Sequence, residues 1–349
     1  MSAKMIGLGI MSGSSLDAID AVVVEISKDQ FRFIEKATIP FPRALKDGLR
    51  QAANLPLRDY LILESEYSTF LAYSILSNFK SDYDFISVHG HTTHHFPSEV
   101  ISNQMINGGI LSALTKKKVV TDFRIGDIAL GGKGTPMVTI AEKYLFKGYD
   151  YYLNLGGIAN ISIAHDWSAY DISPCNQLLN YLAYKINLDY DAEGKVACGG
   201  TMIPELFEAL GRFDYYQELP PKSIDNNWIK ENYFPLLDSV DVIPDALFTT
   251  VKWIATQIDQ SISISQPGNL FVTGGGTHNS FLIEEIRTLL LKKNISIVIP
   301  EQDIVDYKEA ILMAYLGYLR ISNQPNLLHS VTGASRNSLG GAIYNVHGS

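Results

Sequence analysis

The sequence predicts an α/β protein built from two domains, and three observations support this prediction. Its 349 residues exceed the usual length of a single domain. Met5–Ile26 reads as an apolar strand, a Gly-Ser turn and a second apolar strand, and Tyr151–Ile163 repeats this plan. Helical and strand patterns alternate after each hairpin, as is typical of α/β domains. The repeated plan suggests a duplication, with a ligand held between the two turns.

The first third of the chain contains a short series of strands followed by helix–strand alternation. Apolar periodicity predicts each element, and the prolines at 40 and 42 end the first strand after the hairpin. The predicted elements are a strand over Phe31–Ile39, helical structure over Ala44–Phe79, a strand over Phe85–Val88, a helix over Gly109–Thr115 and a strand over Lys118–Thr121.

The remaining two thirds combine regular elements with two irregular stretches. Glycine-rich Asp122–Pro136 is predicted to be a loop where the chain crosses between domains, and Asp189–Asn232 is predicted to be rich in loops. Asp171 is predicted to end a strand, with Ser173 as N-cap and Pro174 as first residue of a helix that continues to about Ile186. The later predictions are helices over Ala246–Ser261, Asn279–Leu291 and Tyr307–Arg320, strands over Leu270–Thr273 and Ile295–Ile299, and a partly irregular tail over Pro325–Ser349.

Composition and charge exclude several classes of protein. The net charge of −9 and the pI of about 5.4 provide no basic surface for nucleic acid. No apolar run approaches the length of a membrane span. Two cysteines, Cys175 and Cys198, are too few for a disulfide framework, and we expect both to pack as small hydrophobic residues. We therefore expect a soluble, cytoplasmic protein.

The glycine-rich segments do not match the two common nucleotide-binding fingerprints. Asp127 stands where a Walker A sequence around Lys133 requires its first glycine, and Ser12 stands where GxGxxG requires its third. The turn that contains Gly13 could still bind an anion through backbone N–H groups, with a metal held by nearby carboxylates. An ordinary hairpin turn explains the same residues.

Two further groups of side chains allow more than one interpretation. His89, His91, His94 and His95 could bind zinc, but no aspartate accompanies them, so we favour a loop that faces a sugar or phosphate, or solvent alone. Asp171 could act as a general base, and it could equally cap the following helix. Arg124 and Lys133 could contact phosphate or could simply be solvated.

Motifs along nearly the whole chain resemble those of the anhydro-N-acetylmuramic acid kinases. Residues 11–20, MSGSSLDAID, resemble the family signature MSGTSLDGID. Residues Leu153–Asn160, LNLGGIAN, fully match a second motif of the family. The other similar segments, in the order of the family, are HGHT at 89–92, DFR at 122–124 with Asp127 and GGKGTP at 131–136, PKS at 221–223, GGGTHN at 274–279, Glu309-Ala310 and SVTGA at 330–334.

This resemblance implies a two-domain, actin-like fold of the sugar-kinase and ribonuclease H-like type, with a nucleotide cleft between the domains. It places an N-terminal domain at residues 1–122, completed by the tail at about 330–349, and a C-terminal domain at 123–329. The implied reaction uses ATP and Mg²⁺ to hydrolyse the 1,6-anhydro ring of anhydro-N-acetylmuramic acid and to phosphorylate O6. The product is N-acetylmuramic acid 6-phosphate, in cell-wall recycling, and the implied assembly is a homodimer.

The resemblance also assigns roles to individual residues. Asp171 falls where the family has its catalytic aspartate and would activate the water that attacks C1. Asp17 and Asp20 would hold Mg²⁺. The residues implied in sugar binding are His89, Arg124, Asp127, Asn160 and Glu309. The residues implied in ATP binding are Gly13, Ser14, Ser15, Leu16, Asp17, Ala18, Ile19, Asp20, Gly156, Gly157, Gly274, Gly275 and Gly276.

One segment departs from the family pattern beside the implied base. Residues 171–176 read DISPCN where the family has DTGPGN, so Ile172, Ser173 and Cys175 replace a threonine and two glycines. Side chains at these positions could crowd a sugar, because glycine often permits close approach of a ligand. Two alternatives therefore remain open, a kinase of another sugar and a catalytically silent ATP-binding protein.

Overall fold

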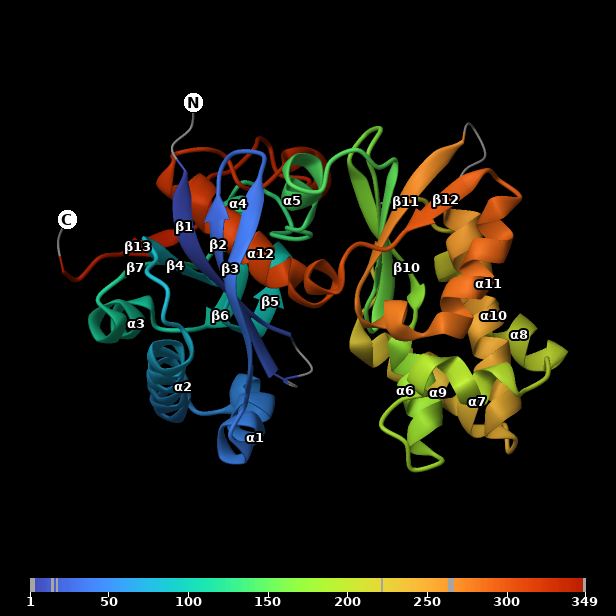
Figure 1. Cartoon of the computed structure of the whole chain (residues 1–349). Helices are drawn as coiled ribbons and strands as arrows, with labels where there is room; N and C mark the ends of the chain where they lie inside the picture. Colours follow the sequence, from blue (N-terminus) through green and yellow to red (C-terminus); the bar gives the residue numbers. More distant parts are fainter. Residues whose placement is uncertain (1–3, 14–15, 17, 221, 263–266, 348–349) are drawn as a thin grey trace. The chain divides into compact units, whose positions relative to one another are not determined.

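The computed structural model describes residues 4–13, 16, 18–220, 222–262 and 267–347. The chain divides into two compact units (Figure 1): Met1–Lys147 with Tyr307–Ser349, and Gly148–Asp306. The first unit therefore includes 123–147 and 307–329, which the resemblance assigned to the C-terminal domain. Both units contain a sheet covered by helices, which confirms the predicted two-domain α/β class.

The first unit is built on a six-stranded sheet with the order β13-β7-β4-β1-β2-β3. The first three strands form an antiparallel meander, β4 and β7 run parallel to β1, and the C-terminal β13 pairs antiparallel with β7. The strands are β1 Met5–Ser12, β2 Ala18–Ile26, β3 Phe31–Pro40, β4 Phe85–Val88, β7 Lys118–Thr121 and β13 Ala342–Tyr344. A separate hairpin consists of β5 His91–Phe96 and β6 Ile101–Met105.

Helices cover both faces of this sheet. Leu8 and Ile10 of β1 point to the core that includes α2 and α3, whereas Gly7 and Gly9 alternate with them and point to the other face. A Cβ atom on Gly9 would lie 2.0 Å from the carbonyl oxygen of Ala310 in α12, so Gly9 permits close helix–sheet packing. The helices of this unit are α1 Arg43–Gln51, α2 Leu57–Asn78, α3 Gly108–Thr115, α4 Ile125–Ala129, α5 Thr139–Tyr144, α13 His329–Thr332 and most of α12 Gln302–Ile321.

The second unit repeats this strand order without an equivalent of β13. Its sheet is β10-β9-β8-β11-β12, with an antiparallel β8-β9-β10 meander and with β11 and β12 parallel to β8. The strands are β8 Tyr151–Leu155, β9 Ile158–Ile163, β10 Ser168–Pro174, β11 Gly268–Thr273 and β12 Ile295–Val298. The same order in both sheets supports the duplication inferred from the two hairpins.

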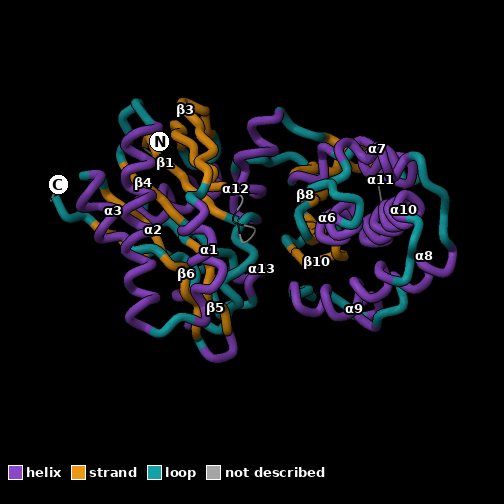
Figure 2. The backbone as a smooth tube through the Cα atoms, turned by 90° about the horizontal axis from the view of Figure 1, so that it is seen from below, coloured by secondary structure: helices purple, strands orange, loops and turns teal. Residues whose placement is uncertain are grey.

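A single apolar core joins the second sheet to its helices. Figure 2 shows α10 and α11 side by side, and the buried side chains of Trp253, Ile254 and Ile286 in these helices belong to that core. The helices are α6 Asn176–Tyr184, α7 Lys195–Cys198, α8 Pro204–Leu210, α9 Asn226–Asp238, α10 Ile243–Ser261 and α11 Ser280–Leu291. The short 3₁₀ helices in the described part of both units are η1 Ala52–Asn54, η2 Pro97–Glu99, η3 Ala192–Gly194, η4 Asp214–Gln217 and η5 Gly275–His278. None of the described helices is long and apolar enough to cross a membrane.

Several predicted elements are wrong in informative ways. Ser173 and Pro174 do not begin a helix: they extend β10 and pair with Ala159 and Ile158, after a bulge between Asp171 and Ser173. The histidine segment contains the strand β5 rather than a loop, and the glycine-rich Asp122–Pro136 contains α4. The segment Asp189–Asn232, predicted to be rich in loops, contains α7, α8 and the start of α9 between irregular stretches. Cys175 is buried as expected, but Cys198 is exposed.

Candidate active site

The opening turn of the first unit is built on buried apolar side chains. The backbone N–H of Leu16 donates to the Gly13 carbonyl oxygen at 3.1 Å, and Leu16 has a φ of 55°. The side chains of Leu16 and Ile19 are buried in the core, so only their peptide groups could contact a ligand. Ala18 begins β2. Ser14, Ser15 and Asp17 lie outside the described residues.

Asp20 lies on β2, between Met11 of β1 and Thr38 of β3. The Thr38 hydroxyl donates to Asp20 Oδ1 at 2.9 Å and lies 3.0 Å from the hydroxyl of Tyr307. Asp20 is half-buried, so part of its carboxylate faces solvent. Directly opposed residues of neighbouring strands share a face of the sheet. The carboxylate is therefore fixed in orientation close to the opening turn.

Buried His89 and half-buried Arg124 form a hydrogen-bonded pair. A terminal nitrogen of Arg124 lies 2.9 Å from His89 Nε2, and His89 Nδ1 lies 2.9 Å from the Gly90 carbonyl oxygen. Burial, with the Arg124 charge, lowers the pKa of His89 to about 3, so its ring is neutral and Nε2 accepts the Arg124 hydrogen bond. Burial lowers the pKa of Arg124 to about 10, against the opposite influence of Glu309. The buried Arg124 Nε has no hydrogen-bond partner within the described part of the chain.

Asp127 is fully buried and holds the glycine-rich loop in place. Its Oδ2 accepts from the Gly134 N–H at 2.9 Å, and its Oδ1 accepts from the hydroxyls of Thr332 at 2.9 Å and Ser338 at 3.2 Å. The Lys133 N–H also donates to the Thr332 carbonyl oxygen at 2.9 Å. This carboxylate therefore links two segments about 200 residues apart in the sequence. The resemblance implied a contact between Asp127 and the sugar, whereas the hydrogen bonds of the carboxylate are to the protein itself.

Glu309 lies on α12 and is exposed to solvent. Next to it, Lys308 forms a buried ion pair with Glu142, with 2.8 Å between Nζ and Oε1. Neither partner of this pair was singled out in the sequence. The ion pair anchors the N-terminal part of α12 within the first unit and so fixes the position from which Glu309 projects.

In the second unit, Asp171 is held at three points by the segment that follows α8. Its Oδ2 accepts from the Ile224 N–H at 3.0 Å, its own N–H donates to the Lys222 carbonyl oxygen at 3.1 Å, and its carbonyl oxygen accepts from the Tyr215 hydroxyl. Burial raises the pKa of Asp171, and the hydrogen bond from Ile224 partly opposes this rise. No side-chain cap is found at the start of α6, so Asp171 is not the helix cap considered from the sequence.

Asn160 lies directly opposite Asp171 in the neighbouring strand, and it also opposes Asn154 of β8. The register therefore places an amide, an amide and a carboxylate in one row across the sheet. Polar side chains in such a row can bind several groups of one ligand. The structure thus brings together two of the predicted site residues, Asn160 and Asp171.

The two glycine segments of the second unit also meet. Gly274 has a φ of 91°, and a Cβ atom on it would lie 2.6 Å from Asn154 Oδ1 and 2.8 Å from the backbone of Leu155. Gly156 and Gly157 follow Leu155, and their carbonyl oxygens accept from the N–H groups of residues 175–177 at the start of α6. Gly276 is buried, whereas a Cβ atom on exposed Gly275 would meet no atom within 4 Å. These loops form one surface of backbone groups at the ends of β8 and β11.

The side chains that depart from the family pattern do not crowd this surface. Ile172 is 3% exposed, and Ser173 and Cys175 are fully buried. Ile172 and Cys175 belong to the apolar core of the second unit. The expected crowding beside Asp171 is therefore absent, because the β10 bulge and the turn into α6 direct these side chains inward.

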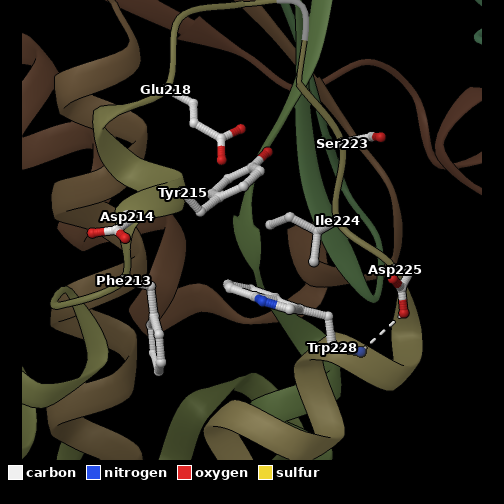
Figure 3. A pocket seen from close by; sticks show the side chains of 8 residues that line it. All are labelled: Phe213, Asp214, Tyr215, Glu218, Ser223, Ile224, Asp225 and Trp228. Carbon is white, nitrogen blue, oxygen red and sulfur yellow. Dashed lines mark hydrogen bonds between the residues drawn. The ribbon is translucent and has the colours of Figure 1, made fainter.

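A pocket of about 410 Å³ adjoins the segment that holds Asp171 (Figure 3). Tyr215 and Ile224, which hydrogen-bond to Asp171, both line it. The complete lining is Phe213, Asp214, Tyr215, Glu218, Ser223, Ile224, Asp225 and Trp228. Of these residues, only Ser223 belongs to a motif recognised in the sequence. The aromatic residues were missed because they lie in a stretch rich in loops, where no helical or strand periodicity points to them.

The four histidines do not gather as metal ligands. His91 Nε2 lies 3.2 Å from the Leu49 carbonyl oxygen, His94 Nδ1 lies 3.1 Å from the Thr93 hydroxyl, and His95 Nδ1 lies 3.1 Å from the Ser102 hydroxyl. Within the described ranges, no group of three or more His, Cys, Asp or Glu side chains could hold a metal ion.

Two meanders, each extended by parallel strands in the same order, define a duplicated α/β protein with glycine turns and an oriented carboxylate. The family model described as "Anhydro-N-acetylmuramic acid kinase" matches residues 5–346. The chain belongs to this family. The recognition made from the motifs is thereby confirmed.

Individual relatives agree with the family assignment. A protein of Nitrosomonas europaea named anhydro-N-acetylmuramic acid kinase is 32% identical, and the match covers 97% of this chain and 99% of the relative. A protein of Aliivibrio fischeri with the same name is 32% identical over 97% and 98% of the two chains. Among solved structures, component A of the Acidaminococcus fermentans (R)-2-hydroxyglutaryl-CoA dehydratase has a TM-score of 0.47 and 12% identity, covering 91% of this chain and 99% of that chain.

Proposed function

We propose that the chain is an ATP-dependent sugar kinase that opens the 1,6-anhydro ring of anhydro-N-acetylmuramic acid and phosphorylates O6. Water adds to C1, the C1–O6 bond breaks, and O6 bonds to the γ-phosphorus as ADP leaves. The products are N-acetylmuramic acid 6-phosphate and ADP. Family membership over nearly the whole chain supports the substrate, and the setting of Asp171 supports the chemistry.

Asp171 is the observation that carries this proposal. A general base must be fixed in orientation and must be basic enough to accept a proton from water. Ile224 holds one carboxylate oxygen, and burial raises the pKa of the group, so its ionised form is a stronger base than an exposed aspartate. Asp171 would take one proton from the attacking water. We expect activity to decline as the pH falls through this raised pKa.

ATP would bind to backbone groups of the glycine turns. In the first unit the assignment covers Gly13, Leu16, Ala18 and Ile19, and the buried side chains of Leu16 and Ile19 leave only their peptide groups available. In the second unit, Gly156 and Gly157 lie beside Gly274, Gly275 and Gly276, and Gly275 is open to solvent. Backbone N–H groups suit phosphate oxygens, and a glycine surface permits close approach of a nucleotide.

Asp20 is the described residue that fits a magnesium ion. Mg²⁺ in kinases usually binds one or two carboxylates together with phosphate oxygens and water, so a large protein cluster is unnecessary. The Asp20 carboxylate is half-buried and oriented by Thr38. A bound Mg²⁺ would neutralise phosphate charge. The role implied for Asp17 lies outside the described residues.

Sugar contacts are proposed for Arg124, Asn160 and Glu309, with His89 in a supporting part. Among the described residues, the buried Nε of Arg124 has no hydrogen-bond partner, and a sugar oxygen could accept its hydrogen. His89 orients the other end of the guanidinium. For Asp127 we propose a positioning role, because its buried carboxylate already accepts three hydrogen bonds.

The test is product analysis with ATP and 1,6-anhydro-N-acetylmuramic acid, comparing the native chain with Asp171→Asn. We expect a product heavier than the sugar by one phosphate group and one water, with ¹⁸O from labelled water at C1. The substitution should lower turnover by about 10²–10⁴-fold, the usual contribution of a general base. A native chain that binds ATP but produces no such compound would overturn the proposal.

The family resemblance also leads us to propose a cytoplasmic homodimer. No described residue pattern identifies the contact surface, so the proposal is tested directly by measuring the mass of the native chain in solution. A mass near twice 38.7 kDa supports the dimer, and a mass near 38.7 kDa refutes it.

A further inference from the structure

The pocket beside Asp171 combines aromatic walls with an acidic rim. Figure 3 shows the Tyr215 ring between the Glu218 carboxylate and the Trp228 indole. Phe213, Tyr215, Ile224 and Trp228 provide the apolar walls, and Asp214 and Glu218 are exposed at the edge. Asp225 also lines the pocket, but its Oδ1 already accepts from the N–H groups of residues 227 and 228 at the start of α9. Asp214 and Glu218 therefore offer carboxylate acceptors at the exposed edge of the pocket.

This combination suits one kind of ligand. Aromatic faces pack well against the C–H groups of a sugar ring, and carboxylates accept hydrogen bonds from hydroxyl and amide N–H groups. An anionic group would be repelled by three carboxylates. Lys222 offsets part of this charge: its ammonium lies over the Tyr215 ring, 4.5 Å from the centroid, donates to the Tyr215 carbonyl oxygen and is attracted by Glu218, so the three carboxylates leave a net negative lining.

Two residues that line the pocket also form hydrogen bonds with Asp171, the proposed base. The Tyr215 ring lines the pocket while its hydroxyl donates to the Asp171 carbonyl oxygen. Ile224 lines the pocket with its side chain while its N–H donates to Asp171 Oδ2. A ligand held between these two residues would therefore lie next to the carboxylate that acts on it.

We infer that this pocket binds the uncharged part of the sugar substrate, meaning the hydroxyl- and acetamido-bearing face, and not the acidic lactyl group. The inference rests on the proposed function and extends it to residues outside the family motifs quoted above. Trp228 and Tyr215 stack against the ring, and Asp214 and Glu218 accept from its hydroxyl and amide groups.

The first experiment measures KM and kcat for Asp214→Ala and Glu218→Ala, with Glu205→Ala as a matched control. All three side chains are exposed acids of the second unit, and Glu205 does not line the pocket. Each pocket variant should raise KM for the sugar about tenfold, the loss of one hydrogen bond to a charged acceptor, with kcat little changed. The control should retain the native KM. Equal KM values for all three variants would overturn the inference.

Two sugars distinguish the group that enters the pocket. Anhydro-N-acetylmuramic acid carries the lactyl carboxylate, and 1,6-anhydro-N-acetylglucosamine lacks it. If the pocket holds the shared uncharged part, the pocket variants raise KM for both sugars by the same factor. A lower KM for the muramic sugar alone would show that the variants relieve repulsion of its carboxylate, and the inference would be wrong.

A binding measurement keeps the inference separate from catalysis. Trp167, Trp228 and Trp253 are the three tryptophans of the chain, and only Trp228 lines the pocket. Adding either sugar should change the intrinsic fluorescence, and Trp228→Phe should abolish the change while Trp167→Phe keeps it. A change that survives Trp228→Phe overturns the inference even if the kinase is active. A Trp228-dependent change without turnover supports the pocket and refutes the proposed reaction.

Discussion

Replacing Asp127 should destabilise the first unit even though the residue lies among the family motifs. Asp127→Ala leaves the Gly134 N–H, the Thr332 hydroxyl and the Ser338 hydroxyl without their common acceptor. The Thr332 hydroxyl has a second acceptor, the Leu328 carbonyl oxygen at 3.3 Å. Two donors are then left unsatisfied, and at about 1–3 kcal/mol each the free energy of unfolding should fall by about 2–6 kcal/mol.

Asp127→Asn is the matched comparison. Its amide oxygen can still accept from the Gly134 N–H, and its NH₂ group can donate to the two hydroxyls if these reverse their roles. The expected loss is about 1 kcal/mol, near the net value of one hydrogen bond. If the charge of Asp127 served a ligand instead of these contacts, the two substitutions would reduce activity alike and leave stability nearly unchanged.

Amide hydrogen exchange provides the assay, because it reports stability within each unit. Strands β4 and β7 in the first unit should lose protection in Asp127→Ala by the amount above, and much less in Asp127→Asn. Tryptophan fluorescence is unsuitable as the sole probe, since all three tryptophans lie in the second unit. A loss below 1 kcal/mol for the alanine variant, or equal losses for both variants, would refute the reasoning.

Three other predictions test the second glycine segment, the buried histidine and the hydroxyl that holds the base. Gly274→Ala should destabilise the second unit, because Gly274 has a φ of 91° and a Cβ atom there would meet Asn154. Gly275→Ala should leave stability unchanged and weaken ATP binding. Calorimetry measures unfolding and ATP binding of both variants, and equal melting temperatures would contradict the prediction for Gly274. His89 stays neutral in the folded protein but binds a proton in the unfolded chain below about pH 6.5, so the first unit should lose stability as the pH falls from about 6.5 towards 3. His89→Gln should reduce this dependence of stability on pH. An unchanged dependence in the variant would contradict the role of His89. Tyr215→Phe should lower kcat and shift the acid side of its pH profile, because the hydroxyl that holds Asp171 is lost. Tyr216→Phe loses the hydroxyl contact with Tyr233 and should leave the acid side of the profile in place. Identical pH profiles for the two variants would exclude a positioning role for the Tyr215 hydroxyl.

Local patterns were sufficient for much of the fold. Phe85–Val88 and Lys118–Thr121 were predicted to the residue, because each is a short apolar run bounded by polar or turn residues. The helix start predicted at Ser173-Pro174 was wrong, because these residues pair with residues 158–159 of β9 instead of capping a helix. Proline is tolerated there because β10 is an edge strand of its sheet.

The candidate site was less accessible to sequence reasoning. Motif resemblance singled out Asp171 and Asn160, and the register of β9 and β10 places them directly opposite each other. It could not show that Asp127 is buried, since that depends on hydroxyls about 200 residues further along the chain. It also passed over Tyr215 and Trp228, because their relation to Asp171 exists only after residues 213–228 fold against β10.

The first unit is built from two segments that are far apart in the sequence, and this affects how it can fold during synthesis. Strand β13, the helix α12 that packs on Gly9, and the hydroxyls bound by Asp127 all come from the last 48 or fewer residues. The second unit, Gly148–Asp306, is continuous and is synthesised before residues 307–349, which contain β13, Ala310 of α12 and the hydroxyls of Thr332 and Ser338. The half of the protein that is translated first must therefore wait longest for its native contacts, and premature termination near residue 306 would release a whole second unit attached to an unfinished first one.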